Sequence, residues 1–175
     1  MNRTLLRTAL LVLALTVTAF STALAGPPWI AIENPANPFD RTSRDAFLTV
    51  RTYHHGNLLA RTVTGTAEGV VNGKRQTMRL DIRPGSQQGM YVVHWQRPAT
   101  GRWVLVINSG EKGIVDASAV VEIGTTGGIA SVTVPTRHVG DGWVGPRAVA
   151  AAEIEGLLQG RAIVSASGPA RAASR

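Results

Sequence analysis

Two adjacent histidines are the residues in this chain most suited to metal chemistry. His54 and His55 lie where a strand-like segment meets Gly56, and Met90 follows later in the chain. Imidazole and thioether groups both suit copper. Adjacent side chains of a strand point to opposite faces, so the two histidines share one ion only if the strand breaks at Gly56. His54 or His55 with Met90 is therefore a speculative copper site. The alternative is that these histidines lie at a loop edge and bind nothing.

The carboxylates and serines suggest little catalysis. The chain has no Gly-x-Ser-x-Gly segment, which marks one class of serine hydrolase. Glu33, Asp40 and Asp45 cluster around one loop and form a possible acid/base set, but such residues more often cap turns and pair with nearby arginines. We expect no enzymatic activity and no cofactor, and a hydrolase without a recognisable motif stays an alternative.

Composition and charge argue against several further classes of function. The chain of 175 residues has no Cys, which rules out disulfides, thiolate metal sites and thiol nucleophiles. Five of its 18 basic residues lie in the two ends (Arg3, Arg7, Arg161, Arg171 and Arg175), and all 11 acidic residues lie between them, so residues 26–159 carry a net charge of only +2. No basic run lies beside aromatic residues, so we expect no nucleic-acid binding.

The N-terminal 25 residues have the layout of a secretory signal peptide. Arg3 and Arg7 form the charged start, an apolar run covers residues 9–19, and Ala23-Leu24-Ala25 is a small-x-small cleavage site. The alternative is a membrane anchor, but the apolar run is short for a helix that needs about 20 residues to span a bilayer. We expect a cleaved, exported protein, periplasmic or extracellular, without stable membrane insertion.

The middle of the chain alternates apolar and polar residues with the period of two that β-strands have. Strands are expected near residues 29–33, 46–54, 58–71, 74–82, 89–96, 102–108, 117–123 and 129–134. Asn72-Gly73 is a strong signal for a two-residue hairpin, and Met78, Leu80 and Ile82 of the strand that follows are expected to point inward. The segment 102–108 is apolar on both faces and should be central and covered twice. The fold class is therefore all-β, an antiparallel immunoglobulin-like sandwich of about seven to eight strands occupying residues 26–145.

A different pattern follows Gly142. Pro146 is a suitable first residue for a helix over residues 146–159, because its missing N–H needs no partner in the first turn. Residues 160–175 are rich in Ala, Ser, Gly and Arg, and we expect a disordered tail there.

One hairpin carries a resemblance to a known group of proteins. Gly89 and Tyr91 open one strand, Trp95 continues it, and Gly101 and Trp103 open the next. This pattern, within residues 46–108, resembles small bacterial exported immunoglobulin-like sandwiches of the YtkA-like and FixH-like type. The resemblance implies a binding or accessory module and transfers no catalytic residue, because the shared positions are structural. The glycines permit the turns, and Tyr91, Trp95 and Trp103 are expected to fill the core.

Aromatic residues outside the expected core are the candidate binding residues. Trp143 lies in an expected loop between Gly142 and Gly145, and Trp29 is close to the expected mature N-terminus, where it is either an exposed anchor or a plug over the sandwich end. Phe39 lies in the other expected binding loop, residues 34–45. We therefore expect an envelope accessory module that binds an unknown protein or envelope polymer, with copper handling as the alternative.

Overall fold

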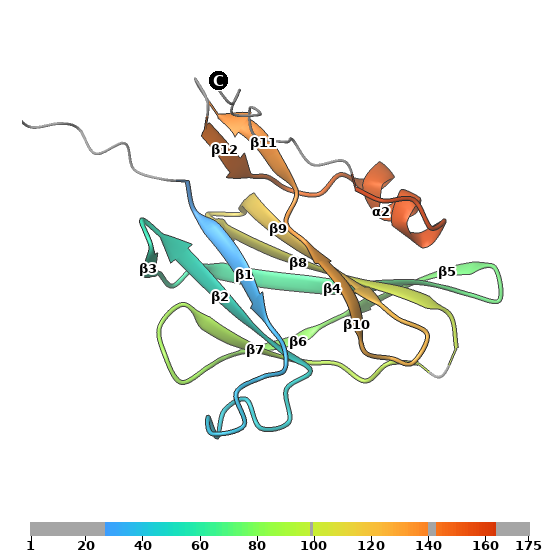
Figure 1. Cartoon of the computed structure of the whole chain (residues 1–175), viewed down its shortest axis with the longest axis horizontal. Helices are drawn as coiled ribbons and strands as arrows, with labels where there is room; N and C mark the ends of the chain where they lie inside the picture. The colour runs from blue at the N-terminus through green and yellow to red at the C-terminus, as the bar shows by residue number, and fades with distance from the viewer. Residues whose placement is uncertain (1–26, 99, 140–142, 164–175) are drawn as a thin grey trace, which may run out of the picture.

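Two antiparallel β-sheets packed face to face form the body of the molecule. A computed structural model describes residues 27–98, 100–139 and 143–163 (Figure 1). The first sheet has the order β1-β2-β7-β6, with β3 paired to β2, and its strands are β1 (Trp29–Glu33), β2 (Leu48–His54), β3 (Asn57–Leu58), β6 (Asp81–Pro84) and β7 (Met90–His94). The second has the order β10-β9-β8-β4-β5, with strands β4 (Thr62–Val71), β5 (Lys74–Arg79), β8 (Arg102–Glu111), β9 (Ile114–Ile123) and β10 (Ile129–Thr133). This all-β sandwich confirms the expected fold class.

The strand order matches the immunoglobulin-like arrangement. Taking β1, β2, β7 and β6 as strands A, B, E and D gives one sheet of that fold, and β9, β8 and β4 then correspond to G, F and C of the other. β5 and β10 extend the second sheet at its two edges. All pairings in both sheets are antiparallel, as the short connections predict.

The core lies between the sheets and is mainly aliphatic, with one large ring that is almost fully buried. Ile30, Leu48 and Val50 from the first sheet meet Trp103 and Leu105 from the second, and all are at most 1% exposed. The rings of Phe47, Trp95 and Trp103 form a chain of edge-to-face contacts, with centroids 5.2 and 6.3 Å apart. Tyr91 and Trp95 are partly buried against this cluster, as the alternation of their strand predicts.

β8 is covered on both faces, as its sequence predicts. Trp103, Leu105 and Ile107 point into the core between the sheets. Val104 and Val106 face the other way and pack with Val120 and with Leu157 and Leu158 of α2 (Ala151–Leu158). The helix therefore buries a second, smaller apolar cluster on the outer face of the second sheet.

The expected strand at residues 74–82 is wrong in one respect. The hairpin at Asn72-Gly73 forms, with positive φ values of 50° and 73°. The chain then changes sheet at Leu80: β5 pairs with β4 in the second sheet, and β6 pairs with β7 in the first. Leu80 is 4% exposed and bridges the layers, whereas Met78, expected to point inward, is 41% exposed because β5 lies at an uncovered edge.

The C-terminal region also differs from expectation. A two-stranded ribbon, β11 (Thr136–Val139) and β12 (Trp143–Pro146), occupies a segment expected to be a loop. Pro146 ends β12, and the helix begins only at Ala151. Together with β3 and the division of β5 from β6, this ribbon explains why there are more strands than the seven to eight expected.

The ends of the chain fall largely outside the described residues. The expected signal peptide, and all of the expected tail except residues 160–163, belong to the parts of the chain that the structure does not describe. Among the residues that it does describe, no helix has the length and apolar character needed to cross a bilayer.

Candidate functional site

Exposed apolar side chains gather at one end of the sandwich. Eight large apolar side chains are exposed among the described residues. Five of them lie where β1 and β9 begin, where β3 ends and where β11 ends: Trp29, Leu59, Ile114, Val115 and Val139. We call these five residues the apolar end. Ile114 is the most exposed of them, at 69%.

The register of the first sheet positions Trp29. Trp29 pairs with Tyr53, and Tyr53 pairs in turn with Leu58. Cross-strand partners point to the same face of a sheet. Ile30, the next residue of β1, is fully buried, so Trp29, Tyr53 and Leu58 form a row on the outer face.

The connection from β3 to β4 ties the two sheets together at this end. The Leu59 N–H donates to Thr52 O at 3.0 Å. Two residues further on, the Tyr91 hydroxyl accepts a hydrogen bond from the Arg61 N–H at 3.0 Å and donates one to the Arg61 carbonyl. The Arg61 side chain is 6% exposed and pairs with Asp116 of β9. These contacts connect the segment that carries Leu59 to the strand that carries Val115.

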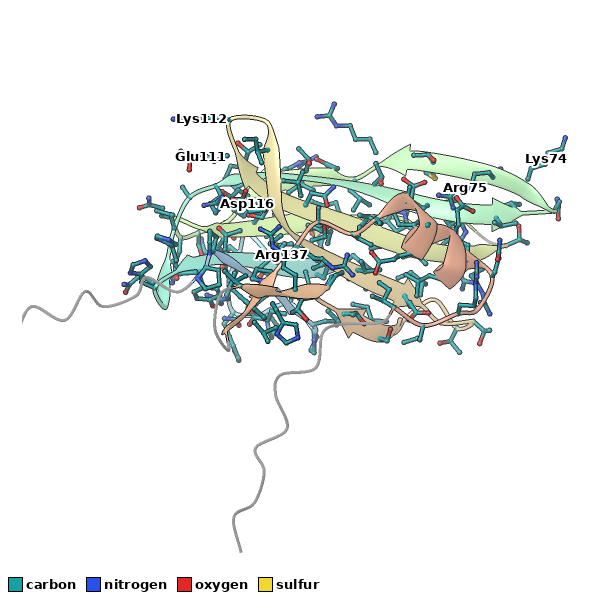
Figure 2. All side chains as sticks on the ribbon, turned by 90° about the horizontal axis from the view of Figure 1, so that it is seen from above. Lys74, Arg75, Glu111, Lys112, Asp116 and Arg137 are labelled. Atoms are coloured by element: carbon teal, nitrogen blue, oxygen red, sulfur yellow. The ribbon has the colours of Figure 1, made fainter. Side chains whose placement is uncertain are left out.

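The hairpin between β8 and β9 carries Ile114 and Val115. Lys112 and Gly113 form its turn, both with positive φ, and Ile114 pairs with Glu111. Figure 2 shows Glu111 and Lys112 at the tip of this hairpin and Asp116 further along it. A shallow groove of about 180 Å³ lies beside Ile114 and Val115.

Val139 reaches the same end through the small ribbon. A Cβ placed on Gly145 of β12 would lie 3.0 Å from Pro27 Cγ and 3.1 Å from Val139 Cγ2. The ribbon therefore packs against the residues that lead into β1, and Figure 1 shows it beside the beginning of that strand. The backbone of Trp143 pairs with Val139, so it lies at this end too, in a strand rather than in the expected loop.

His54 and His55 lie next to this end. His55 has a φ of 53°, and β2 gives way there to the turn that leads into β3. The strand thus breaks, which is the condition that two adjacent histidines need to approach each other. Their ring centroids are 4.1 Å apart, and the planes are inclined by 47°.

The fold does not place Met90 next to His54 and His55. It pairs with Arg51 of β2, and His54, three residues further along the same strand, points to the opposite face. Met90 is only 3% exposed, and its sulfur lies 3.7 Å from Ser86 Oγ. The three residues of the suggested copper site are therefore not assembled. In the described ranges, no group of three or more His, Asp or Glu side chains could hold a metal ion.

The carboxylates of the first loop make structural contacts. Glu33 pairs with Arg51 at 2.9 Å. Asp40 accepts hydrogen bonds from Ser86 and Thr42, which lower the pKa of Asp40 below its ordinary value. Glu33 therefore pairs with an arginine of the neighbouring strand, and Asp40 accepts hydrogen bonds within and next to a turn, which are the structural roles expected of such carboxylates.

Phe39 is far from Trp29. The loop that carries Phe39 leaves β1 after Glu33, whereas Trp29 begins that strand. Phe39 is 94% exposed, and its N–H donates to Asn37 Oδ1 at 3.0 Å. The sequence-based binding candidates therefore separate: Trp29 and the backbone of Trp143 lie at the apolar end, and Phe39 lies at the opposite end.

Sequence reasoning missed four of the five residues of the apolar end. One signal was available for two of them, because Lys112-Gly113 between two alternating segments indicates a tight hairpin whose second strand starts at Ile114. Leu59 and Val139 had no comparable signal, since their exposure depends on contacts between distant segments.

Comparison of the chain with protein-family models, with curated proteins and with solved structures gives no match.

Proposed function

We propose that the chain is an exported, non-catalytic binding module and that the apolar end is its contact surface for a protein partner. The observation that carries this proposal is the concentration of five of the eight exposed large apolar side chains at one end. Isolated exposed apolar residues are common, but a cluster rimmed by polar groups is typical of an interaction site.

The composition of the surface favours a protein over an envelope polymer. Four of its five members are aliphatic, and only Trp29 offers a flat ring on which a sugar could stack. Charged residues lie beside members of the apolar end: Glu111 and Lys112 are at the tip of the hairpin that carries Ile114, and Arg137 lies on β11, two residues before Val139 (Figure 2). An apolar centre with a charged rim is the usual composition of protein–protein interfaces.

Export is part of the same proposal and is supported by the layout of residues 1–25. Its direct check is N-terminal sequencing of the protein recovered from the producing cells. A mature chain beginning at Gly26 is the expected result, and a chain that keeps its first 25 residues contradicts export by cleavage.

A matched pair of variants tests the surface. Ile114→Ser with Val115→Ser removes the most exposed part of the apolar end, and Met78→Ser with Val132→Ser removes two exposed apolar side chains elsewhere. Each immobilised protein is incubated with extract from the producing cells, and the bound proteins are quantified. Proteins that bind the wild type should bind the first variant at least about tenfold less, since losing apolar contacts worth about 1.4 kcal/mol has that effect.

The second variant is the control and should bind the same proteins as the wild type. Equal loss in both variants, or equal capture by all three proteins, contradicts the proposed surface. If isolated envelope polysaccharide binds in the same pattern in place of protein, the partner is a polymer and the assignment to a protein is wrong.

A further inference from the structure

The structure contains a second candidate site, away from the apolar end and independent of it. A depression of about 410 Å³ lies between the beginning of β8, the end of β9 and the segment after α2. Arg97, Arg102 and Glu122 are the charged residues that line it. Ile114, a member of the apolar end, begins β9, whose other end lines this depression.

Neither arginine has a carboxylate partner among the described residues. Arg97 Nη1 donates to Thr125 O at 2.9 Å, and Arg102 Nη1 donates to Leu157 O at 3.3 Å. A guanidinium has five N–H donors, so each side chain has donors left over. Arg97 Nε is buried and has no acceptor in the described part of the chain.

Both guanidinium groups are held close to the backbone. A Cβ placed on Gly127 would lie 3.2 Å from Arg97 Nη1, and one placed on Gly160 would lie 2.9 Å from Arg102 Nη1. A side chain at either glycine would therefore displace an arginine. Because each arginine is also fixed by a carbonyl, less side-chain freedom is lost when a ligand binds.

Glu122 limits the ligands that fit. Its Oε1 accepts a hydrogen bond from Ser131 Oγ at 2.7 Å, and it lines the same depression as the two arginines. The lining therefore has one net positive charge. Guanidinium groups bind carboxylates and phosphates through paired, charge-assisted hydrogen bonds.

From this geometry we propose that Arg97 and Arg102 form a binding site for an oxyanion, a carboxylate or phosphate group carried by a compact ligand. The ligand is either a free small molecule or one unit of an acidic polymer, since both present the same group. Glu122 weakens the site for a bare anion and offers an acceptor to a ligand that has hydroxyl groups beside its anion.

Titration of the full chain with inorganic phosphate, and separately with glucuronate, tests the proposal. Binding is followed by NMR shifts of the backbone amides and of the Arg97 and Arg102 side-chain N–H groups. These signals should shift and saturate by roughly 10 mM ligand, where a site with a dissociation constant of about 1 mM is mostly filled. Glucose is the neutral counterpart of glucuronate and should shift none of them. An alginate oligomer, a chain of acidic sugars, tests whether the ligand is one unit of a polymer. If it is, the oligomer should bind more tightly than glucuronate.

Charge variants locate the site. Arg97→Gln or Arg102→Gln should weaken phosphate binding at least about fivefold, and Glu122→Gln should tighten it, because a repulsive charge is removed. Arg79→Gln removes an exposed arginine on β5, outside the depression, and should leave the affinity unchanged. Thermal unfolding of each variant separates loss of the site from loss of the fold.

The proposal is overturned if neither phosphate nor glucuronate shifts these signals. Equal weakening by Arg79→Gln and Arg97→Gln overturns it too, because it shows general attraction to a basic protein. Neither result bears on the proposal that the apolar end binds a protein partner.

Discussion

Tyr91 shows how a single side chain can connect the two sheets. The sequence predicts that Tyr91 faces the core, and the structure places it partly buried against that cluster. Its hydroxyl bonds both backbone groups of Arg61, a residue 30 positions away. Alternation gives the face on which a side chain lies, but a partner this distant depends on how the sheets meet, so the sequence did not reveal it.

Tyr91→Phe should lower the free energy of unfolding by about 1–3 kcal/mol. The change leaves the ring in place and leaves the backbone N–H and carbonyl of Arg61 without their partner. Urea denaturation measures the effect. Tyr53→Phe is the matched control, because the Tyr53 hydroxyl has no hydrogen bond among the described residues, and it should change stability by less than about 0.5 kcal/mol. Equal effects from both changes would show that the bridge to Arg61 contributes nothing.

Gly69 is required by the ring of Trp103. A Cβ on Gly69 would lie 2.5 Å from Trp103 Cε3, so Gly69→Ala should destabilise the fold by about 1–3 kcal/mol through overpacking. Gly128→Ala is the control, since open space surrounds that position. Chemical denaturation of both variants provides the comparison. Wild-type stability of Gly69→Ala would mean that Trp103 does not occupy the described position.

At the scale of elements, α2 is held to the sandwich by the residues before it. The Arg147 N–H donates to Pro135 O, and the Arg147 carbonyl accepts from the Ser118 N–H. Its guanidinium pairs with both carboxylate oxygens of Glu153, at 2.6 and 2.7 Å. Glu153 Oε2 also accepts the Ala150 N–H at 2.8 Å, which caps the helix.

The Arg147–Glu153 contact predicts a pH dependence with a definite sign. Hydrogen bonding to Arg147 lowers the pKa of Glu153, so the stabilisation is complete above the ordinary glutamate pKa and is lost as the pH falls through the lower folded-state value. Glu153→Gln should therefore cost about 1 kcal/mol of unfolding free energy near pH 7 and progressively less towards about pH 3.

Denaturation of the wild type and Glu153→Gln across this pH range measures the difference. Glu155→Gln, on the same helix, changes a carboxylate that is 52% exposed and pairs with Arg75 at 3.2 Å, and it should have little effect. A stability difference for Glu153→Gln that does not change with pH would contradict the role assigned to the ionised pair.

The sequence predicted an element correctly where its side chains have the same surroundings along its whole length. The Asn72-Gly73 hairpin and the double-sided apolar pattern of β8 are both confirmed. The predictions failed where the surroundings change partway along a regular pattern of residues. Met78, Leu80 and Ile82 keep the period of two, but the chain changes sheet at Leu80, and so Met78 ends on an open edge. Pro146 fits a helix start and a strand end equally well, and the pairing of β12 with β11 decides between them.

At the scale of the whole molecule, the apolar end is a product of tertiary structure. Its five residues come from four segments distant in sequence: β1, the residue after β3, the start of β9 and the end of β11. The sequence identified only Trp29 among them. Whether a side chain at a strand end is exposed depends on which distant segments pack against it. In contrast, Phe39 and Trp29 looked equivalent in the sequence, but Trp29 begins β1 and Phe39 lies in the loop that follows the other end of that strand.

Site-specific photo-crosslinking in the producing cells tests the central claim, that the apolar end contacts a protein partner. A photoreactive phenylalanine analogue at position 114 samples this end, and the same group at position 132, on β10, is the control, because both side chains are exposed. We predict a discrete crosslinked protein from position 114 that is absent from position 132. No product from position 114, or the same product from both positions, would contradict the claim.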